Sequence, residues 1–182
     1  PFCAAPARAE RIASSTGGSS MSAAHRQQNY PAIELRLATV DDIDGLVLLF
    51  ATFFRESRYQ PALQFDPAIC ANYLRAAIGS GFSPHIIALH GDQIVGVISY
   101  HFDSSFSAKP LAVMDEVYAL EEYRGTPVGR ALVATALDLA KGDGAACIHI
   151  PLTSGHKAMP SLINLFKKFG AEEIGVVMRK VL

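Results

Sequence analysis

Short apolar runs alternate with longer helical patterns along most of the chain. Apolar and polar residues alternate over 33–38, which predicts a strand. Apolar residues then recur at helical spacing over 41–57, and Asp66 followed by Pro67 predicts a second helix that ends by Gly81. Two helices are therefore expected after the first strand.

The middle of the chain is predicted to form three consecutive strands. Gly91 and Asp92 make a tight turn between two apolar runs, so residues 86–102 are expected to form a hairpin. The run 111–120 adds a third antiparallel strand. The remaining pattern predicts a helix over 130–141, a strand over 145–152, a helix over 159–169 that Gly170 ends, and a final strand over 173–181.

A glycine-containing turn, 121–130, joins the strand 111–120 to the helix that follows it. Arg124, Gly125 and Gly129 suit a loop whose backbone N–H groups converge on an anion at the positive end of a helix. A pyrophosphate would fit there. Because strand-to-helix turns also contain glycine for purely steric reasons, the turn alone leaves both interpretations open.

Composition and charge narrow the classes of function. The chain has 182 residues, half of them apolar, which suits one domain with a packed core. A net charge of -1 gives no electrostatic surface for nucleic acid, and no apolar run approaches the ~20 residues needed to span a membrane. The three cysteines are widely spaced, so neither disulfides nor a metal site is indicated and a cytoplasmic protein is expected.

The first residues differ in composition from the rest. Residues 1–20 are rich in Ala, Ser and Gly and end just before Met21, which we take as the native start. This extension is interpreted as appended sequence, upstream read-through or a weak targeting peptide, without fixed structure. Residues 21–32 are expected to be a flexible arm, and 33–182 a single domain.

The order of elements, together with the 121–130 turn, resembles the GNAT superfamily of acyl-CoA-dependent N-acyltransferases. Residues 117–132 resemble the strand, bend and phosphate loop of that family, and 164–170 resemble its late helix. The resemblance implies an α/β (α+β) GNAT fold with a mixed, mostly antiparallel sheet of six to seven strands and about four helices. It also implies that the fourth and fifth strands splay apart.

The resemblance further implies acetyl-CoA as a co-substrate, with its pantetheine arm in the gap between the splayed strands. The implied coenzyme-binding residues are Val117, Ala119, Leu120, Arg124, Gly125, Thr126, Pro127, Val128, Gly129, Arg130, Asn164 and Phe166. Two of these depart from the family pattern. Pro127 replaces the middle glycine of the loop and has no N–H, and Phe166 replaces a tyrosine that in many members protonates the leaving thiolate.

The expected reaction is direct attack of a primary amine on the thioester in a ternary complex. An ammonium group must first lose a proton, for which Glu116 is the first candidate base and Asp115 the second. Because neighbours on a strand face opposite sides, only one of them is expected to face the cleft. Tyr118 is a candidate proton donor to the thiolate, and a backbone N–H near Ala119 or Leu120 is expected to stabilise the oxyanion.

Several alternatives remain at this level. His101 and His156 are further candidate bases, although a structural role suits each of them better. The acceptor could be a small molecule, a peptide N-terminus or a protein lysine. The alternative function is a GNAT-fold protein that has lost catalysis and serves as a CoA-binding or assembly module. An apolar edge at the last strand would suit a homodimer.

Overall fold

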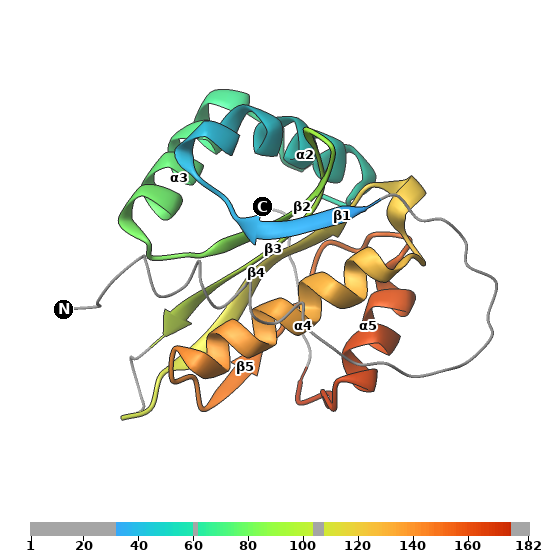
Figure 1. The fold of residues 1–182 in the computed structure, drawn as a ribbon. Coiled ribbons are helices and arrows are strands. Elements are labelled where there is room, and N and C mark those ends of the chain that lie inside the picture. The colour runs from blue at the N-terminus through green and yellow to red at the C-terminus, as the bar shows by residue number, and fades with distance from the viewer. Residues whose placement is uncertain (1–31, 60–61, 104–107, 176–182) are drawn as a thin grey trace.

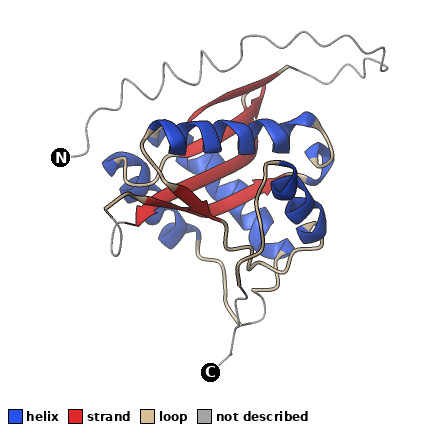
Figure 2. Cartoon of the chain, turned by 90° about the horizontal axis from the view of Figure 1, so that it is seen from below, coloured by secondary structure: helices blue, strands red, loops and turns tan. Residues whose placement is uncertain are grey.

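A central sheet lies between two pairs of helices. The structure is a computed structural model that describes residues 32–59, 62–103 and 108–175. Helices α2 (Ile43–Glu56) and α3 (Pro67–Ser80) cover one face, and α4 (Pro127–Gly142) and α5 (Met159–Lys168) cover the other (Figure 1). Figure 2, seen from below, shows the strands crossing between these helices.

The sheet of the described residues has five strands in sequence order. They are β1 (Ile33–Leu37), β2 (His85–His90), β3 (Gln93–Asp103), β4 (Leu111–Ala119) and β5 (Cys147–His149). The first four form antiparallel pairs with one another, and β5 runs parallel to β4 after the crossover through α4. This mixed, mostly antiparallel sheet with four α-helices confirms the predicted fold class.

Strand β5 is shorter than its sequence pattern predicts. It pairs with β4 only from Leu111 to Val113, and the second half of β4 has no β5 partner. The predicted splay between the fourth and fifth strands is therefore present. The predicted strand 173–181 and the homodimer expected at its edge fall largely beyond residue 175, outside the described residues.

Local chemistry explains where α3 begins and ends. The Asp66 carboxylate accepts hydrogen bonds from the backbone N–H groups of Ala68 and Ile69 at 2.8 and 3.1 Å, and Pro67 occupies the first helical position. At the other end Gly81 adopts a φ of 67°, a conformation that costs glycine little. The predicted boundaries of this helix are confirmed.

A short 3₁₀ turn, η1 (Val40–Asp42), precedes α2 where the sequence predicts one continuous helix. Asp42 accepts two hydrogen bonds from the Arg36 guanidinium, both of 2.7 Å, and another from the Thr39 N–H at 2.8 Å. These bonds, chiefly those from Arg36, lower the pKa of Asp42 to about 2. They fix the direction in which the chain leaves β1.

Each face of the sheet has its own apolar core. Tyr100, Met114 and Leu132 are fully buried on the face covered by α4 and α5, whereas Leu46 and Leu74 are buried under α2 and α3. Within the described residues, no helix is both long enough and apolar enough to cross a membrane.

Candidate active site

A β-bulge in β4 brings two carboxylates to one side of the sheet. Asp115 and Glu116 both stand opposite the single residue Ser99 of β3, where the strand register shifts. The extra residue interrupts the alternation of side chains, so these neighbours do not have to face opposite sides. Both line the same cleft, and the expectation that only one would face it is wrong.

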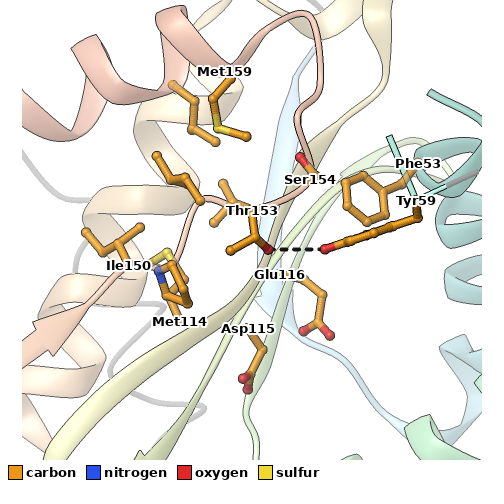
Figure 3. A pocket seen from close by; sticks show the side chains of 13 residues that line it. Phe53, Tyr59, Met114, Asp115, Glu116, Ile150, Thr153, Ser154 and Met159 are labelled. Atoms are coloured by element: carbon orange, nitrogen blue, oxygen red, sulfur yellow. Dashed lines mark hydrogen bonds between the residues drawn. The ribbon is translucent and has the colours of Figure 1, made fainter. Parts of the chain in front are cut away.

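The cleft opens where β4 and the segment after β5 diverge, and it holds about 410 Å³ of space that is open to solvent. In Figure 3 the two carboxylates lie at one end, Met159 at the other, and Phe53 and Tyr59 to one side. The hydroxyls of Tyr59 and Thr153 are 3.2 Å apart and hydrogen-bonded, joining the turn after α2 to the segment after β5. The residues that line the cleft are Phe53, Tyr59, Met114, Asp115, Glu116, Val117, Ile150, Pro151, Leu152, Thr153, Ser154, Met159 and Leu162.

Glu116 lies in surroundings that raise its pKa. Its side chain is only 21% exposed, and its Oε2 accepts a hydrogen bond from the Ser99 hydroxyl. Burial raises the pKa of Glu116 to about 7, and the nearby charge of Asp115 acts in the same direction. A carboxyl group with that pKa is partly ionised near neutral pH, which suits a general base.

Asp115 is held in place from β3 and from the turn before β2. Nδ1 of His101 lies 2.8 and 2.9 Å from the two oxygens of Asp115, and the Ser83 hydroxyl donates to the same carboxylate at 3.4 Å. The ring of Phe82 stacks on the His101 ring with 5.6 Å between centroids. His101, an alternative base, therefore supports Asp115 instead of standing alone in the cleft.

Glu56, at the end of α2, joins three segments through one carboxylate oxygen. Its Oε2 accepts hydrogen bonds from the Tyr118 hydroxyl at 3.1 Å, from Nη2 of Arg124 at 2.5 Å and from Nε2 of His156 at 2.7 Å. Burial alone would raise the pKa of Glu56, but the bonds from His156 and Arg124 lower it below its ordinary value. His156, the other alternative base, is therefore held by its hydrogen bond to Glu56.

Sequence reasoning missed Glu56. The residues that it binds lie 62, 68 and 100 positions further along the chain, so no local motif could show their proximity. Its only local feature is a carboxylate at the C-terminal end of a helix, where the helix dipole disfavours negative charge. That conflict is a weak signal that a distant partner exists.

Tyr118 is poorly suited to the predicted role of proton donor. Burial raises its pKa to about 12, and the charge of Glu56 adds to this effect. Because a free thiol titrates near ~8.5, transfer of a proton from such a phenol to a thiolate is uphill. Tyr118 lies on the same face as Glu116, as predicted, but its hydroxyl is engaged with Glu56.

The end of β4 uses its backbone groups internally. The N–H of Leu120 donates to the Val95 carbonyl at 2.9 Å, so Leu120 is wrong as the predicted oxyanion donor, and the Ala119 N–H stays a prediction. Nε of Arg124 donates to the Ala119 carbonyl at 2.9 Å, and its guanidinium turns toward Glu56. Nη1 of Arg124 is buried and has no hydrogen-bond partner among the described residues.

The turn into α4 has the shape that the sequence predicts. Gly125 adopts a φ of 77°, and Thr126 caps the helix by accepting a 3.3 Å hydrogen bond from the Val128 N–H. Pro127 occupies the first helical position and cannot donate. Gly129 follows in the first helical turn, where backbone N–H groups have no acceptor within the helix, and a Cβ on it would lie 3.7 Å from Cδ2 of Leu165.

The comparisons with known proteins agree with this geometry. The acetyltransferase (GNAT) family model matches residues 48–171, more than half of the chain. The chain belongs to the GNAT acetyltransferase family. No curated protein gives a significant match.

Solved structures share the GNAT fold at low sequence identity. A Trypanosoma brucei acetyltransferase is 19% identical with a TM-score of 0.63, covering 83% of this chain and 100% of that one. A predicted acetyltransferase from Clostridium acetobutylicum, solved with acetyl-CoA, is 15% identical with a TM-score of 0.67, covering 82% and 96%. An aminoglycoside acetyltransferase from an uncultured soil metagenomic sample, in complex with sisomicin, is 17% identical with a TM-score of 0.64, covering 82% and 96%.

Of the GNAT-implied coenzyme residues, Val117 alone lines the cleft, and others lie on α4 and α5. Phe166 is buried in the core between α5, α4 and the sheet, whereas Met159 and Leu162 of the same helix line the cleft. Asn164 is exposed on α5, and the Arg130 guanidinium lies 5.9 Å from the centroid of the Phe169 ring. Their predicted coenzyme contacts stay predictions.

Proposed function

We propose that this chain is an N-acetyltransferase that moves the acetyl group of acetyl-CoA to a primary amine by direct attack in a ternary complex. One observation carries the proposal: the bulge places Asp115 and Glu116 together in the cleft between the diverging β4 and β5 segments. Helix α5 connects this cleft with the start of α4. Leu162 lines the cleft, and Leu165 lies 3.7 Å from the position of a Cβ on Gly129.

The coenzyme is proposed to lie along β4 and to end at α4. Its pyrophosphate would sit at the N-terminus of α4, where Gly125 and Gly129 leave the backbone open and the helix dipole favours anions. Its pantetheine arm would bond to the backbone of Val117 and Ala119. Arg124 keeps its buried Nη1 as a donor for the coenzyme. The acetyl-CoA in the Clostridium acetobutylicum structure supports this choice of co-substrate.

Glu116 is proposed to be the general base. Its raised pKa lets it take a proton from an ammonium group near neutral pH, while the Asp115 carboxylate attracts that cation into the cleft. The freed amine attacks the thioester carbonyl, and the C–S bond electrons leave with sulfur. Because Tyr118 is a weak acid and Phe166 has no hydroxyl, the thiolate leaves without a proton from either.

The acceptor is proposed to be a small molecule with one ammonium group on an apolar body. Most residues that line the cleft are apolar, and its acidic groups are Asp115 and Glu116. Nearby Glu56 and Glu121 are paired with Arg124 and Lys157. The aminoglycoside acetyltransferases of the same fold are named for small-molecule acceptors, which supports a small molecule over a protein as the acceptor.

The first test is calorimetric titration of the full chain with acetyl-CoA and with CoA, followed by thiol release in a panel of amines. Micromolar binding and faster thiol release with apolar monoamines are expected. Binding without thiol release in any amine would favour a coenzyme-binding module, and no binding would overturn the proposal. Faster thiol release with polyamines, aminoglycosides or peptides would support the acetyltransferase activity but contradict the proposed class of acceptor.

A further inference from the structure

His85 places a buried nitrogen beside Glu116 that no described residue uses. Nδ1 of His85 lies 2.8 Å from the Ser83 carbonyl, which can only accept, so Nδ1 carries the proton and neutral Nε2 carries a lone pair. The side chain is fully buried, and Nε2 has no hydrogen-bond partner among the described residues. Buried polar atoms are nearly always paired, so this one calls for an explanation.

The nearest charged group to that nitrogen is the proposed base. Nε2 of His85 lies 3.7 Å from Oε2 of Glu116, slightly too far for a hydrogen bond while Glu116 is drawn to Ser99. Two hydrogen-bond acceptors that face each other repel, whereas a proton on either one would allow a hydrogen bond between them. Nε2 of His85 therefore gains a partner only when Glu116 or His85 has taken up a proton.

The proposed reaction supplies such protons. An ammonium acceptor loses two protons from nitrogen: the first before attack and the second when the C–N bond has formed. One carboxylate can hold only one of them at a time. A site with a single base must therefore release the first proton to water before it can take the second.

We propose that His85 is a positioning residue that acts through Glu116 as a proton relay. Glu116 takes the first proton from the ammonium group, which breaks an N–H bond and forms an O–H bond. That proton then moves to Nε2 of His85, and Glu116 returns to its carboxylate form and takes the second proton. As the C–S bond breaks, one proton goes to the thiolate and the other leaves to water with the products. This inference rests on the proposed acetyltransferase function.

The surroundings of the pair allow His85 to be neutral at rest and protonated during turnover. The titratable groups that act on the pair come from three elements: Cys70 and Tyr73 of α3, His101 of β3 and Asp115 of β4. Burial lowers the pKa of His85, so its Nε2 is free before the reaction. The Asp115 charge opposes that effect and stabilises the imidazolium once it forms.

The test is the variant His85→Asn, because an asparagine amide can still donate to the Ser83 carbonyl but offers no acceptor at the Nε2 position. We expect kcat to fall about tenfold or more, within the range of general acid–base effects, with unchanged acetyl-CoA affinity. His149→Asn is the matched control, since His149 is exposed on β5. The control is expected to leave kcat unchanged.

The pH profile separates a relay from a purely structural role. In the wild type, protonated Glu116 can donate to Nε2, which favours its protonated form and raises its pKa. The acidic limb of kcat against pH is therefore expected to move to lower pH in His85→Asn. A limb that stays in place, or a kcat that stays unchanged, overturns the relay even when thiol release confirms the acetyltransferase.

A second measurement needs neither the variant nor turnover. Nitrogen NMR of the histidine rings in the wild type is expected to show the Nδ1–H tautomer for His85. Its Nε2 resonance should titrate together with Glu116, and Glu116→Gln should abolish that change. An Nε2–H tautomer or an independent titration overturns the inference. Failure of every amine to release thiol would instead overturn the proposed function.

Discussion

Glu116 shows how the surroundings of one side chain determine the proposed chemistry. An exposed glutamate would be a weak base at neutral pH, but burial beside Asp115 raises its pKa to about 7. The bulge opposite Ser99 brings Asp115 close to Glu116, because it places the two carboxylates on one face. Phe166 illustrates the opposite case, since its ring has no hydroxyl and packs in the core, which leaves α5 without a proton donor at that position.

Replacement of Glu116 by glutamine should reduce kcat about 10²- to 10⁴-fold, because the amide cannot accept the ammonium proton. In the wild type the rate should rise as pH increases through about 7, where Glu116 loses its proton, and the variant should lack this limb. Steady-state thiol release between pH 5.5 and 8.5 measures both effects. Glu172→Gln, an exposed control, should keep the limb. A wild-type profile that is flat across this range would place the base elsewhere.

The same group should influence folding stability in a defined direction. Its pKa is higher in the folded state than the ordinary 4.5, so the folded protein binds this proton more tightly than the unfolded chain does. Its contribution to the free energy of unfolding therefore falls as pH rises from about 4.5 to about 7. Urea unfolding should measure the difference in the free energy of unfolding between Glu116→Gln and the wild type. This difference should favour the variant more at pH 8 than at pH 4.5. An equal difference at both values would contradict the raised pKa.

At the scale of elements, the turn from β4 into α4 prepares the proposed coenzyme site. Gly125 supplies the left-handed backbone, Thr126 caps the helix and Pro127 starts it. Gly129 has room for a side chain, since a Cβ at this position would lie 3.7 Å from its nearest neighbouring atom. A larger side chain at this position could therefore reach the proposed pyrophosphate site without disturbing the helix.

Gly129→Glu should abolish acetyl-CoA binding while leaving the fold intact, because its carboxylate would occupy the proposed pyrophosphate position. The matched control is Gly79→Glu on α3, where a Cβ meets no atom within 4 Å. Calorimetry should detect at least a tenfold loss of affinity in the first variant, and thermal unfolding should give similar Tm values for the two. Equal acetyl-CoA affinity in both variants would contradict the proposed pyrophosphate site at the N-terminus of α4.

At the scale of the whole molecule, Glu56 connects the layer formed by α2 and α3 to the segment before α5. Its carboxylate binds Tyr118 and Arg124 near the end of β4 and His156 after β5. The Arg58 N–H donates to the Ser154 carbonyl at 2.8 Å close by. These contacts hold the wall of the cleft that short β5 leaves without strand pairing.

Glu56→Gln should loosen this wall, since the neutral amide leaves the partly buried Arg124 without its charged partner. We expect about 1–3 kcal/mol of lost stability and faster hydrogen exchange at 153–158, with β2 and β3 unchanged. Hydrogen exchange with mass spectrometry measures the effect segment by segment. Glu34→Gln on β1 is the control, because Glu34 lies outside this network. If hydrogen exchange in the Glu56 variant changed equally at 153–158 and in β2 and β3, the network would not hold the wall of the cleft.

The sequence predicted elements wherever the decisive contacts are local. Asp66, Pro67 and Gly81 define α3 within one helix, and Gly91 closes the hairpin of β2 and β3. It overestimated β5, because the apolar run 145–152 fills the core beyond the three residues that pair with β4. It missed the bulge, since nothing in the alternation of residues 111–120 shows that two of them would oppose one residue of β3.

The sequence by itself determined the order of the described elements, the glycine-containing turn before α4 and the resemblance to GNAT acetyltransferases. These depend on hydrophobic periodicity, helix capping and backbone conformation, which act between residues close in the chain. Only the tertiary structure decided that Asp115 and Glu116 share one face, that His85 directs a bare nitrogen at Glu116, and that Glu56 gathers three distant partners. Strand register and burial set these relations, and both arise from contacts between residues far apart in the sequence.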